Sequence, residues 1–271
     1  MIELKQLRES AELTQEQAAD RLDWHPTKIF RIETGRTGPH PNDVRAMLDI
    51  YGVTDLGPRE ALLQLAKEAR KRGWWYSYRD VLPSKYEFYI GMESEASSIR
   101  TFELAVVPGL LQTESYAQAL IRGGPLELED EEIQRRLEVR INRQQLLTRP
   151  DRPQLWAILD EAAIRRRIGG PEVMRTQLQH LERSAQGKTT IQIVPFGVGA
   201  HPATTGPFIV LGFPRPTDVD VAYMETIGGN LWVDKPEEVE QYSTAFDHLR
   251  AVALSPDDTR DMLNTAIKEL S

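Results

Sequence analysis

Apolar residues in the first 55 positions recur every three or four residues, which is the spacing of one face of an α-helix. Leu4 and Leu7 predict a short first helix, and Ala18 and Ala19 predict the inner side of a second. The segment that starts at Thr14 reads Thr-Gln-Glu-Gln, the pattern of a capping box at the start of this second helix. Because the two alanines are small, they let another helix approach closely, and the pattern favours a tightly packed helical domain.

A third helix is predicted from Pro26, because proline is favoured at the first helical position. Ile29 and Ile32 lie about 60° apart on this helix, so both face inward. Gly35 is expected to end it, and Asn42 is expected to cap a fourth helix. These elements predict an all-helical N-terminal domain over residues 1–57.

From about residue 80 the pattern changes to short β-rich runs that alternate with helical stretches. The β-rich runs lie at 101–107, 154–159, 189–195, 207–213, 219–225 and 231–233. The helical patterns lie at 114–122, 129–148, 171–186, 236–254 and from 256 to the end. This alternation predicts an α/β (or α+β) domain with a mixed sheet over residues 80–271. The chain is therefore expected to be multidomain, with an α domain followed by an α/β domain.

Residues 58–79 are predicted to form a helical and aromatic linker between the two domains. Basic residues gather near its middle, and the run Trp74-Trp75-Tyr76-Ser77-Tyr78 follows them. Interleaved basic and aromatic side chains could bind single-stranded nucleic acid by stacking. Anchoring of the linker on the next domain through the buried area of the aromatic rings is the favoured interpretation.

The composition is that of a folded, water-soluble chain. Of the 271 residues, 40% are hydrophobic and 27% are charged. No stretch approaches the roughly 18 apolar residues of a membrane helix, and the first residues lack the apolar core of a signal peptide. The chain has no cysteine, which excludes disulfides and thiolate chemistry. A cytoplasmic protein with no membrane association is expected.

The net charge of −8 argues against nucleic-acid binding at first sight, but phosphate binding depends on local positive charge. Residues 1–55 hold seven Lys or Arg against ten Asp or Glu, a balance of −3. Any DNA affinity must therefore come from the placement of a few cations, and weak non-specific binding is expected.

The run from Leu13 to Ala19, followed by the run from Thr27 to Arg36, resembles the helix-turn-helix of phage-repressor-like (XRE, Cro/C1-type) regulators. The resemblance covers about 50 residues and combines the capping box, the turn, the inward aliphatics and the terminal glycine. It implies double-stranded DNA as a partner, with the exposed side of the third helix in the major groove.

By this resemblance, the base-reading positions are Thr27, Lys28, Phe30 and Arg31, and the phosphate-contacting positions are Gln15 and Arg36. An arginine could bind a guanine edge, and a threonine or phenylalanine could contact a thymine methyl. Phe30 replaces the small residue usual at its position, so its ring either contacts a base or folds against the domain surface. His25 stands where a Ser or Thr cap is typical, which leaves the start of the third helix open.

Motifs of enzymes are absent from the sequence: it has no phosphate-binding loop, no nucleophile elbow and no zinc helix. Glu93, Glu161, Glu225 and His201 could line a pocket or supply an acid and a base, but no spacing links them. Helix caps and ion pairs are the favoured roles for them. No catalytic residue, metal site or cofactor is predicted, and the chain is expected not to be an enzyme.

A second resemblance covers residues 80–260. It is carried by the runs that start at Val107 (Val-Pro-Gly-Leu-Leu-Gln-Thr-Glu-Ser-Tyr-Ala), Leu159, Gly206, Tyr223 and Phe246. In this order they look like the C-terminal domain of WhiJ-like actinobacterial regulators. The resemblance implies a small companion protein related to the developmental regulator BldB as a partner, in an antitoxin-like pair.

Together these observations predict a sequence-specific DNA-binding regulator whose second domain binds the companion protein. A homodimer is expected, because repressor-like heads bind two half-sites about 34–36 Å apart. Three alternatives stay open: a repressor that senses a small molecule, an enzyme that the DNA-binding head localises, and an antitoxin for which DNA binding is secondary. An acidic C-terminal segment, with a charge of −5 over residues 236–271, either steers a basic partner or is a solvated surface.

Overall fold

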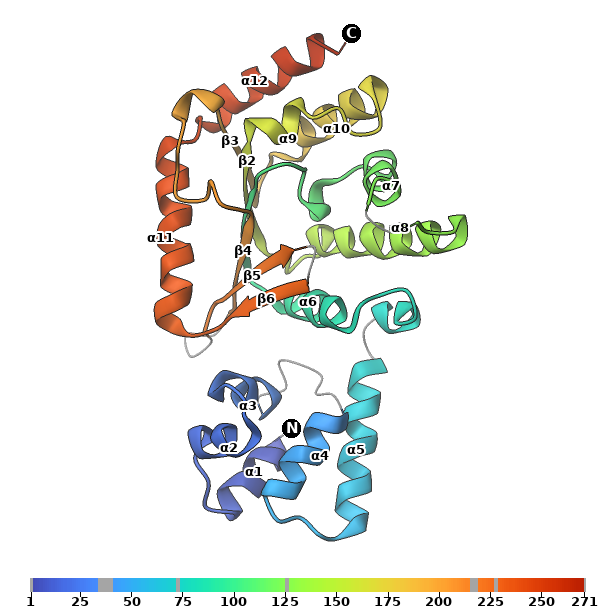
Figure 1. The fold of residues 1–271 in the computed structure, drawn as a ribbon, viewed down its shortest axis with the longest axis vertical. Coiled ribbons are helices and arrows are strands. Elements are labelled where there is room, and N and C mark those ends of the chain that lie inside the picture. The colour runs from blue at the N-terminus through green and yellow to red at the C-terminus, as the bar shows by residue number, and fades with distance from the viewer. Residues whose placement is uncertain are drawn as a thin grey trace. The chain divides into compact units, whose positions relative to one another are not determined.

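The computed structural model describes residues 2–33, 41–71, 74–124, 127–214, 219–226 and 229–270 (Figure 1). The chain divides into two compact units, residues 1–95 and 96–271. In the described part of the chain, no helix has both the length and the apolar character that a membrane span requires.

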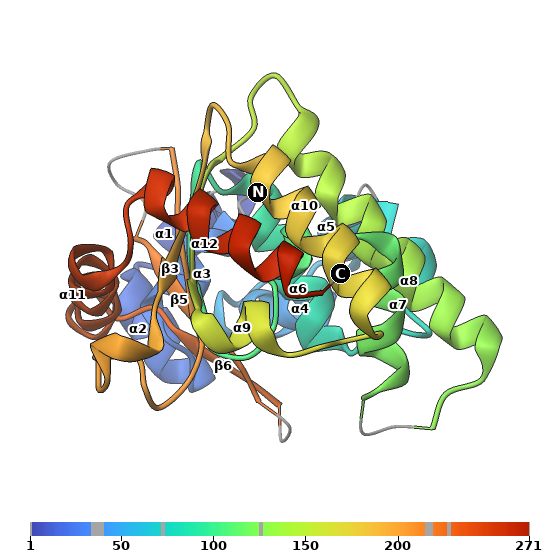
Figure 2. The ribbon, with the colours of Figure 1, turned by 90° about the horizontal axis from the view of Figure 1, so that it is seen from above.

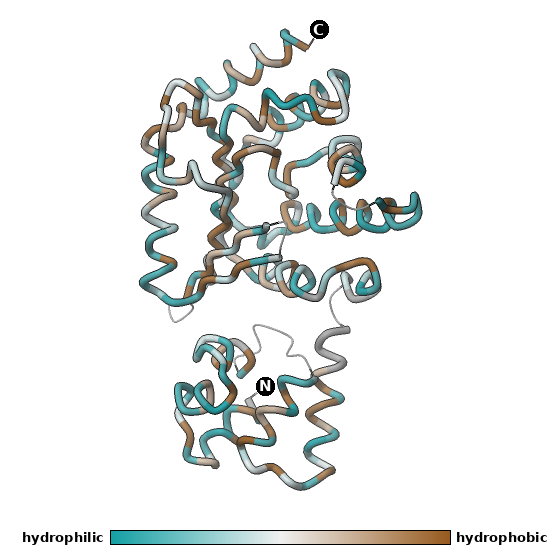
Figure 3. The backbone as a smooth tube through the Cα atoms, viewed as in Figure 1, coloured by the Kyte–Doolittle hydropathy of each residue, from teal (hydrophilic) through white to brown (hydrophobic). Residues whose placement is uncertain are grey.

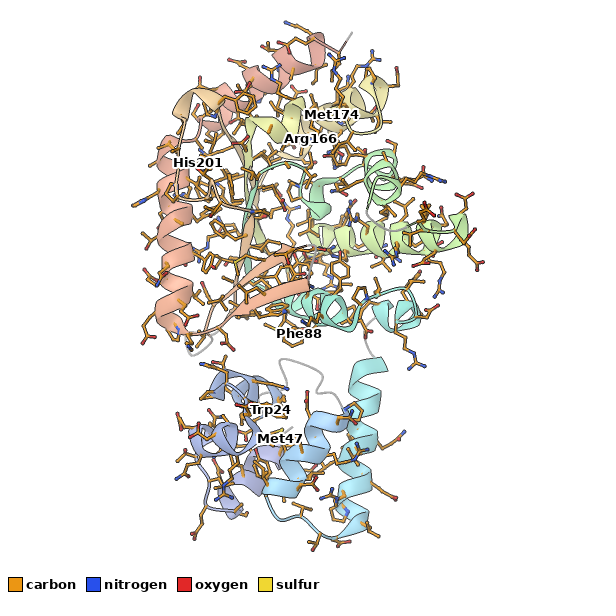
Figure 4. All side chains as sticks on the ribbon, in the orientation of Figure 1. Trp24, Met47, Phe88, Arg166, Met174 and His201 are labelled. Atoms are coloured by element: carbon orange, nitrogen blue, oxygen red, sulfur yellow. The ribbon has the colours of Figure 1, made fainter. Side chains whose placement is uncertain are left out.

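The first unit is built from helices, as the hydrophobic periodicity predicts. They are α1 (Ile2–Ser10), α2 (Gln15–Leu22), α3 (Pro26–Glu33), α4 (Pro41–Ile50), α5 (Leu56–Lys71), the short 3-10 helix η1 (Trp74–Tyr78) and α6 (Ser84–Glu95). Ala18 and Ala19 are fully buried in its core together with Ile29 and Met47 (Met47 is labelled in Figure 4). The small side chains on α2 thus leave room for α3 and α4.

Helix α5 contributes side chains to this core. Leu62 and Ala66, one helical turn apart, are buried in the same apolar cluster as the residues of α1 to α4. A four-residue apolar spacing thus buries one face of α5 against α4. The first compact unit extends to residue 95, and the domain bounds expected from the sequence, 1–57, 58–79 and 80–271, stay a prediction.

Six strands in the described part of the second unit form one mixed sheet. They are β1 (Ser98–Glu103), β2 (Gln154–Asp160), β3 (Thr189–Val194), β4 (Phe208–Gly212), β5 (Val221–Thr226) and β6 (Gly229–Val233). Their order is β3-β2-β1-β4-β5-β6. Strands β1, β2 and β3 are parallel, whereas β4 is antiparallel to both β1 and β5, and β6 is antiparallel to β5. The predicted mixed sheet is confirmed.

Helices cover both faces of the sheet. They and the 3-10 segments are η2 (Gly109–Leu111), α7 (Glu114–Arg122), α8 (Asp130–Gln144), η3 (Gln145–Thr148), α9 (Glu161–Arg165), α10 (Pro171–Ser184), η4 (Phe196–Val198), α11 (Pro236–Val252) and α12 (Pro256–Lys268). Figures 1 and 2 show α11 on one face and α7, α8 and α10 on the other. Phe102 and Ile158 of the sheet pack with Phe246 and Leu249 of α11, and the strands are the most hydrophobic part of this unit (Figure 3).

The segment that begins at Val107, which carries the second resemblance, is held by buried polar side chains. The backbone N–H of Val107 donates to the Tyr116 hydroxyl (3.1 Å), and its carbonyl accepts from the Gln112 amide (2.6 Å). Gln177 of α10 is fully buried. Its amide nitrogen donates to the Leu111 carbonyl (2.7 Å), and its amide oxygen accepts from the Thr113 backbone N–H (2.7 Å). These bonds satisfy buried backbone groups that no strand or helix pairs. The motif is therefore a structural connection between β1 and α7.

Candidate nucleic-acid interface

The start of α2 confirms the predicted capping box. The Thr14 hydroxyl accepts from the Gln17 backbone N–H (3.1 Å), and the Gln17 side-chain oxygen accepts from the Thr14 backbone N–H (2.9 Å). The helix ends at Leu22, and the next residue, Asp23, has a left-handed backbone conformation with φ of 54°. This turn redirects the chain toward α3, as a helix-turn-helix requires.

Helix α3 begins at Pro26, and His25 takes the place of its cap. The backbone N–H of Thr27 donates to His25 Nδ1 (3.3 Å), and the Thr27 hydroxyl lies 3.0 Å from the same nitrogen. A ring nitrogen that accepts a hydrogen bond satisfies one of the unpaired N–H groups at a helix start, as a Ser or Thr oxygen would. The start of α3, which the sequence left open, is therefore capped by the His25 imidazole.

Thr27 and Lys28, both predicted base-reading residues, contact neighbouring side chains of the head. Thr27 is 9% exposed and its hydroxyl faces His25. The Lys28 ammonium lies 3.0 Å from the Asp43 carboxylate of α4 and 3.6 Å from the centre of the Trp24 ring (Figure 4 labels Trp24). Lys28 remains 41% exposed, so its ammonium is held by neighbours yet accessible from outside.

The other predicted contact residues are spread over α2, α3 and the segment that follows. Phe30 is half-buried on α3. Arg31 belongs to α3, but its side chain lies outside the described residues, as does all of Arg36. The side-chain amide of Gln15 donates to the Glu33 carboxylate (3.0 Å). The assignment of these residues to bases and phosphates stays a prediction.

A buried ion pair, which the sequence analysis missed, holds α3 against α1. Arg8 donates to both carboxylate oxygens of Glu33, at 2.7 and 3.0 Å, and to the Leu13 carbonyl at 2.6 Å. The side chains of Arg8 and Glu33 are 7% and 0% exposed. The Tyr51 hydroxyl approaches the same carboxylate at 3.4 Å. Because Gln15 also donates to it, the carboxylate at the end of α3 is surrounded by donors.

The electrostatics of this cluster follow from its burial. The hydrogen bond to Glu33 is the largest cause that raises the pKa of Arg8. Burial, together with the negative charge of Glu33, raises the pKa of Tyr51. A sequence signal for the pair existed: Arg8 follows the buried Leu4 by four residues, and Glu33 follows the buried Ile29 by four. Opposite charges at two such inward positions predict a buried pair.

Comparisons with known families agree with the two units. A helix-turn-helix domain model matches residues 2–62, which include α1 to α4 and the start of α5. A model described as Domain of unknown function (DUF5753) matches residues 86–265, which are 180 of the 271 residues. The chain belongs to the DUF5753 family. Neither the curated proteins nor the solved structures gave a match to the chain.

The DUF5753 match starts within α6 and ends within α12, so it covers all six described strands. The N-terminal unit is a helix-turn-helix domain, a fold whose ordinary role is DNA binding in transcriptional regulation. The sequence-based architecture of a helix-turn-helix head followed by an α/β domain is confirmed at this level.

The acidic and histidine candidates lie on different elements of the structure. Glu161 of α9 accepts from the Phe196 backbone N–H (2.9 Å) and pairs with Arg165 (3.1 Å). His201 Nε2 lies 3.7 Å from the carboxylate of Asp160 at the end of β2. Glu225 lies on β5, and Glu93 belongs to α6 of the first unit, where it accepts from a tyrosine hydroxyl on the same helix. The favoured roles of helix caps and ion pairs fit these contacts.

Proposed function

We propose that this protein is a sequence-specific transcriptional regulator that reads operator DNA with α3. The observation that supports this best is the capped α2–turn–α3 arrangement, in which Arg8 and Glu33 hold α3 by a buried, bidentate ion pair. A recognition helix must be held rigidly, because base discrimination depends on side-chain positions accurate to a fraction of an ångström.

The proposed readers are Arg31, Lys28, Phe30 and Thr27. Because the Thr27 hydroxyl faces His25, its methyl group is the part suited to a thymine methyl. The proposed phosphate contacts are Gln15 and Arg36. An amide nitrogen carries two hydrogens, so Gln15 donates one to Glu33 and keeps the other for a phosphate oxygen. Glu33 thereby orients the amide before DNA arrives.

The charge of the head favours a complex in which two heads bind the DNA together. Residues 1–55 carry a balance of −3, so a single head gains little from the phosphates. A homodimer that places two heads on half-sites about 34–36 Å apart would gain by effective concentration without a new contact. We therefore propose a homodimer on a two-fold symmetric operator.

The DUF5753 domain is proposed to receive the signal that controls DNA binding. The resemblance to WhiJ-like actinobacterial regulators favours a small companion protein related to BldB, in an antitoxin-like pair that acts in the cytoplasm. The acidic segment 236–271 is the proposed docking region for a basic companion surface, with a charge of −5. Part of this charge is already paired on the protein, for example Asp247 with Arg250. No catalytic step is assigned to the domain.

The test is binding of the full chain to the DNA upstream of its own gene, measured by fluorescence anisotropy at about 150 mM salt. It is run with and without the small protein encoded next to it. Arg31→Ala should lose about 1–3 kcal/mol on the operator and relax sequence preference. Arg36→Ala should weaken specific and non-specific binding alike and flatten the salt dependence. Arg122→Ala, an equal charge change on α7, is the matched control.

Each outcome bears on one part of the proposal. Specific binding that the companion strengthens or abolishes supports the two-protein regulator, and the direction says whether the companion is a corepressor or an antagonist. Specific binding that the companion leaves unchanged rejects the companion and keeps the DNA-binding function. Equal losses for Arg31→Ala on every sequence would make Arg31 a phosphate contact. No specific binding in either condition would overturn the proposed function.

A further inference from the structure

A groove runs between α11 and the strands β2 and β3 of the DUF5753 domain. Figures 1 and 2 show α11 along this face of the sheet, and β3 is the strand at the sheet's edge. The groove is lined by Trp156 of β2, Gln192 of β3, and Asp247, Arg250 and Ala251 of α11, and its volume is about 460 Å³. Sites for small molecules have volumes of roughly 300–1,000 Å³. The groove therefore has the size of such a site.

Two hydrogen bonds fix the floor of the groove. Trp156 Nε1 donates to the side-chain oxygen of Gln192 (2.8 Å), and the Gln192 amide nitrogen donates to the Leu254 carbonyl after α11 (2.8 Å). The Trp156 ring also packs edge-on against Phe246 of α11, with the ring centres 6.4 Å apart. Gln192 is buried, whereas Trp156 is half-buried and keeps part of its ring open to the groove. The floor is therefore a fixed aromatic surface.

The guanidinium of Arg250 is held in place at the wall of the groove. Its central carbon lies 4.0 Å from the centre of the Trp156 ring, a cation–π contact that restrains the guanidinium against the indole. Its Nη1 donates to the Asp247 carboxylate one turn earlier on α11 (2.9 Å). A guanidinium has five N–H donors, and among the described residues Asp247 is the acceptor that Arg250 has. The other N–H groups are thus positioned in advance for an acceptor from outside the chain.

The donors and the aromatic floor together select the chemistry of a ligand. A carboxylate matches the planar fork of a guanidinium and accepts two parallel, charge-assisted hydrogen bonds from it. The Asp247 and Arg250 side chains are 59% and 43% exposed, and an exposed pair of this kind contributes little, so a ligand can displace Asp247. Gln192 gives one amide hydrogen to the protein and keeps a second for the same acceptor. Beside these donors, Trp156 and Ala251 offer apolar surface to a flat ring.

We propose that the groove between α11 and the strands β2 and β3 binds a small aromatic carboxylic acid. The carboxylate of the ligand accepts from Arg250 in place of Asp247, and the ring of the ligand lies against Trp156. This site goes beyond the proposed function, since it assigns an effector class to the DUF5753 domain and does not depend on DNA binding.

The test uses the full chain and three probes that share one ring system and differ in charge: 2-naphthoate, 2-naphthamide and 2-naphthylmethylammonium. Isothermal titration at pH 7 should show binding of 2-naphthoate and binding of the other two that is at least about tenfold weaker. Arg250→Gln should weaken 2-naphthoate binding about tenfold, the loss expected for one charge-assisted hydrogen bond. Asp247→Asn should strengthen it by about threefold, because the competing carboxylate is gone. Arg260→Gln and Asp257→Asn change an exposed pair of the same spacing on α12 and should bind as the parent protein does.

A nuclear magnetic resonance spectrum of the indole N–H groups gives the place of binding. The Trp156 signal, identified by its loss in Trp156→Phe, should shift when 2-naphthoate is added. Equal affinity for the three probes would overturn the proposal, as would an unchanged affinity in Arg250→Gln, weaker binding in Asp247→Asn or an unshifted Trp156 signal. Because operator binding is a separate readout, failure here leaves the proposed function standing, and failure of operator binding leaves this site standing.

Discussion

Replacement of Glu103 by glutamine should make the DUF5753 domain more stable above neutral pH. In the folded protein, burial and Glu225 raise the pKa of Glu103 to about 8, against 4.5 for an ordinary glutamate. Between these two values the unfolded chain has lost its proton while the folded chain keeps it. The free energy of unfolding of the parent protein must therefore fall as pH rises from about 4.5 to about 8, and level off above that. Glutamine has no proton to lose, so the variant lacks this decline.

The magnitude follows from the difference in pKa. A difference of 8 − 4.5 = 3.5, at about 1.4 kcal/mol for each pH unit, gives at most about 5 kcal/mol. Because the side chain retains some contact with solvent, the expected effect is nearer to about 3 kcal/mol. For a domain of this size that corresponds to roughly 6–12 °C in the midpoint of thermal unfolding.

Differential scanning calorimetry at pH 5, 7 and 9 measures this effect on the full chain. The transition of Glu103→Gln should lie above that of the parent protein at pH 9, and the gap should narrow toward pH 5. Glu131→Gln, exposed on α8, should show no gap that depends on pH. If the difference between Glu103→Gln and the parent is the same at pH 5 and pH 9, Glu103 is solvated and ionised in the folded protein, and burial does not raise its pKa.

The remaining predictions concern both units. Arg8→Met alone should lower the free energy of unfolding of the head by about 3–5 kcal/mol, because it leaves the Glu33 carboxylate buried and unpaired. In calorimetry, the double variant with Glu33→Leu should recover most of that loss. No recovery would show that the pair contributes more than charge compensation. Asp43→Asn should tighten binding to every DNA sequence by several fold in anisotropy assays. The reason is that the change releases the Lys28 ammonium and removes a negative charge from the head. Unchanged affinity would place Lys28 outside the interface. Gln177→Leu should lower the unfolding free energy by about 1–3 kcal/mol, because the buried Leu111 carbonyl and the half-buried Thr113 N–H lose their partner. A loss below about 1 kcal/mol would mean that water replaces the amide.

The sequence by itself determined most of the elements and their order, although it predicted the first strand at 101–107, where the structure has β1 at Ser98–Glu103, and it did not predict α6 or α9. Helical spacing of apolar residues and a four-residue capping box are local features, so the start of α2 at Gln15 could be predicted from Thr14 and Gln17 alone. The strands were located for the same reason, since short β-rich runs bounded by turns report on each segment without knowledge of its neighbours. The mixed sheet followed from the alternation of these runs with helices.

Only the tertiary structure decided which distant residues meet. Arg8 and Glu33 are 25 residues apart and pair through the packing of α1 on α3. Glu103 and Glu225 lie on one face at the same end of the sheet because β4 enters the sheet between β1 and β5, a register that no local pattern encodes. Both the fixed position of α3 and the raised pKa of Glu103 depend on such non-local pairing. Each side chain was visible in the sequence, but burial and the charge of its neighbours gave it its chemical properties, and both depend on the folded chain.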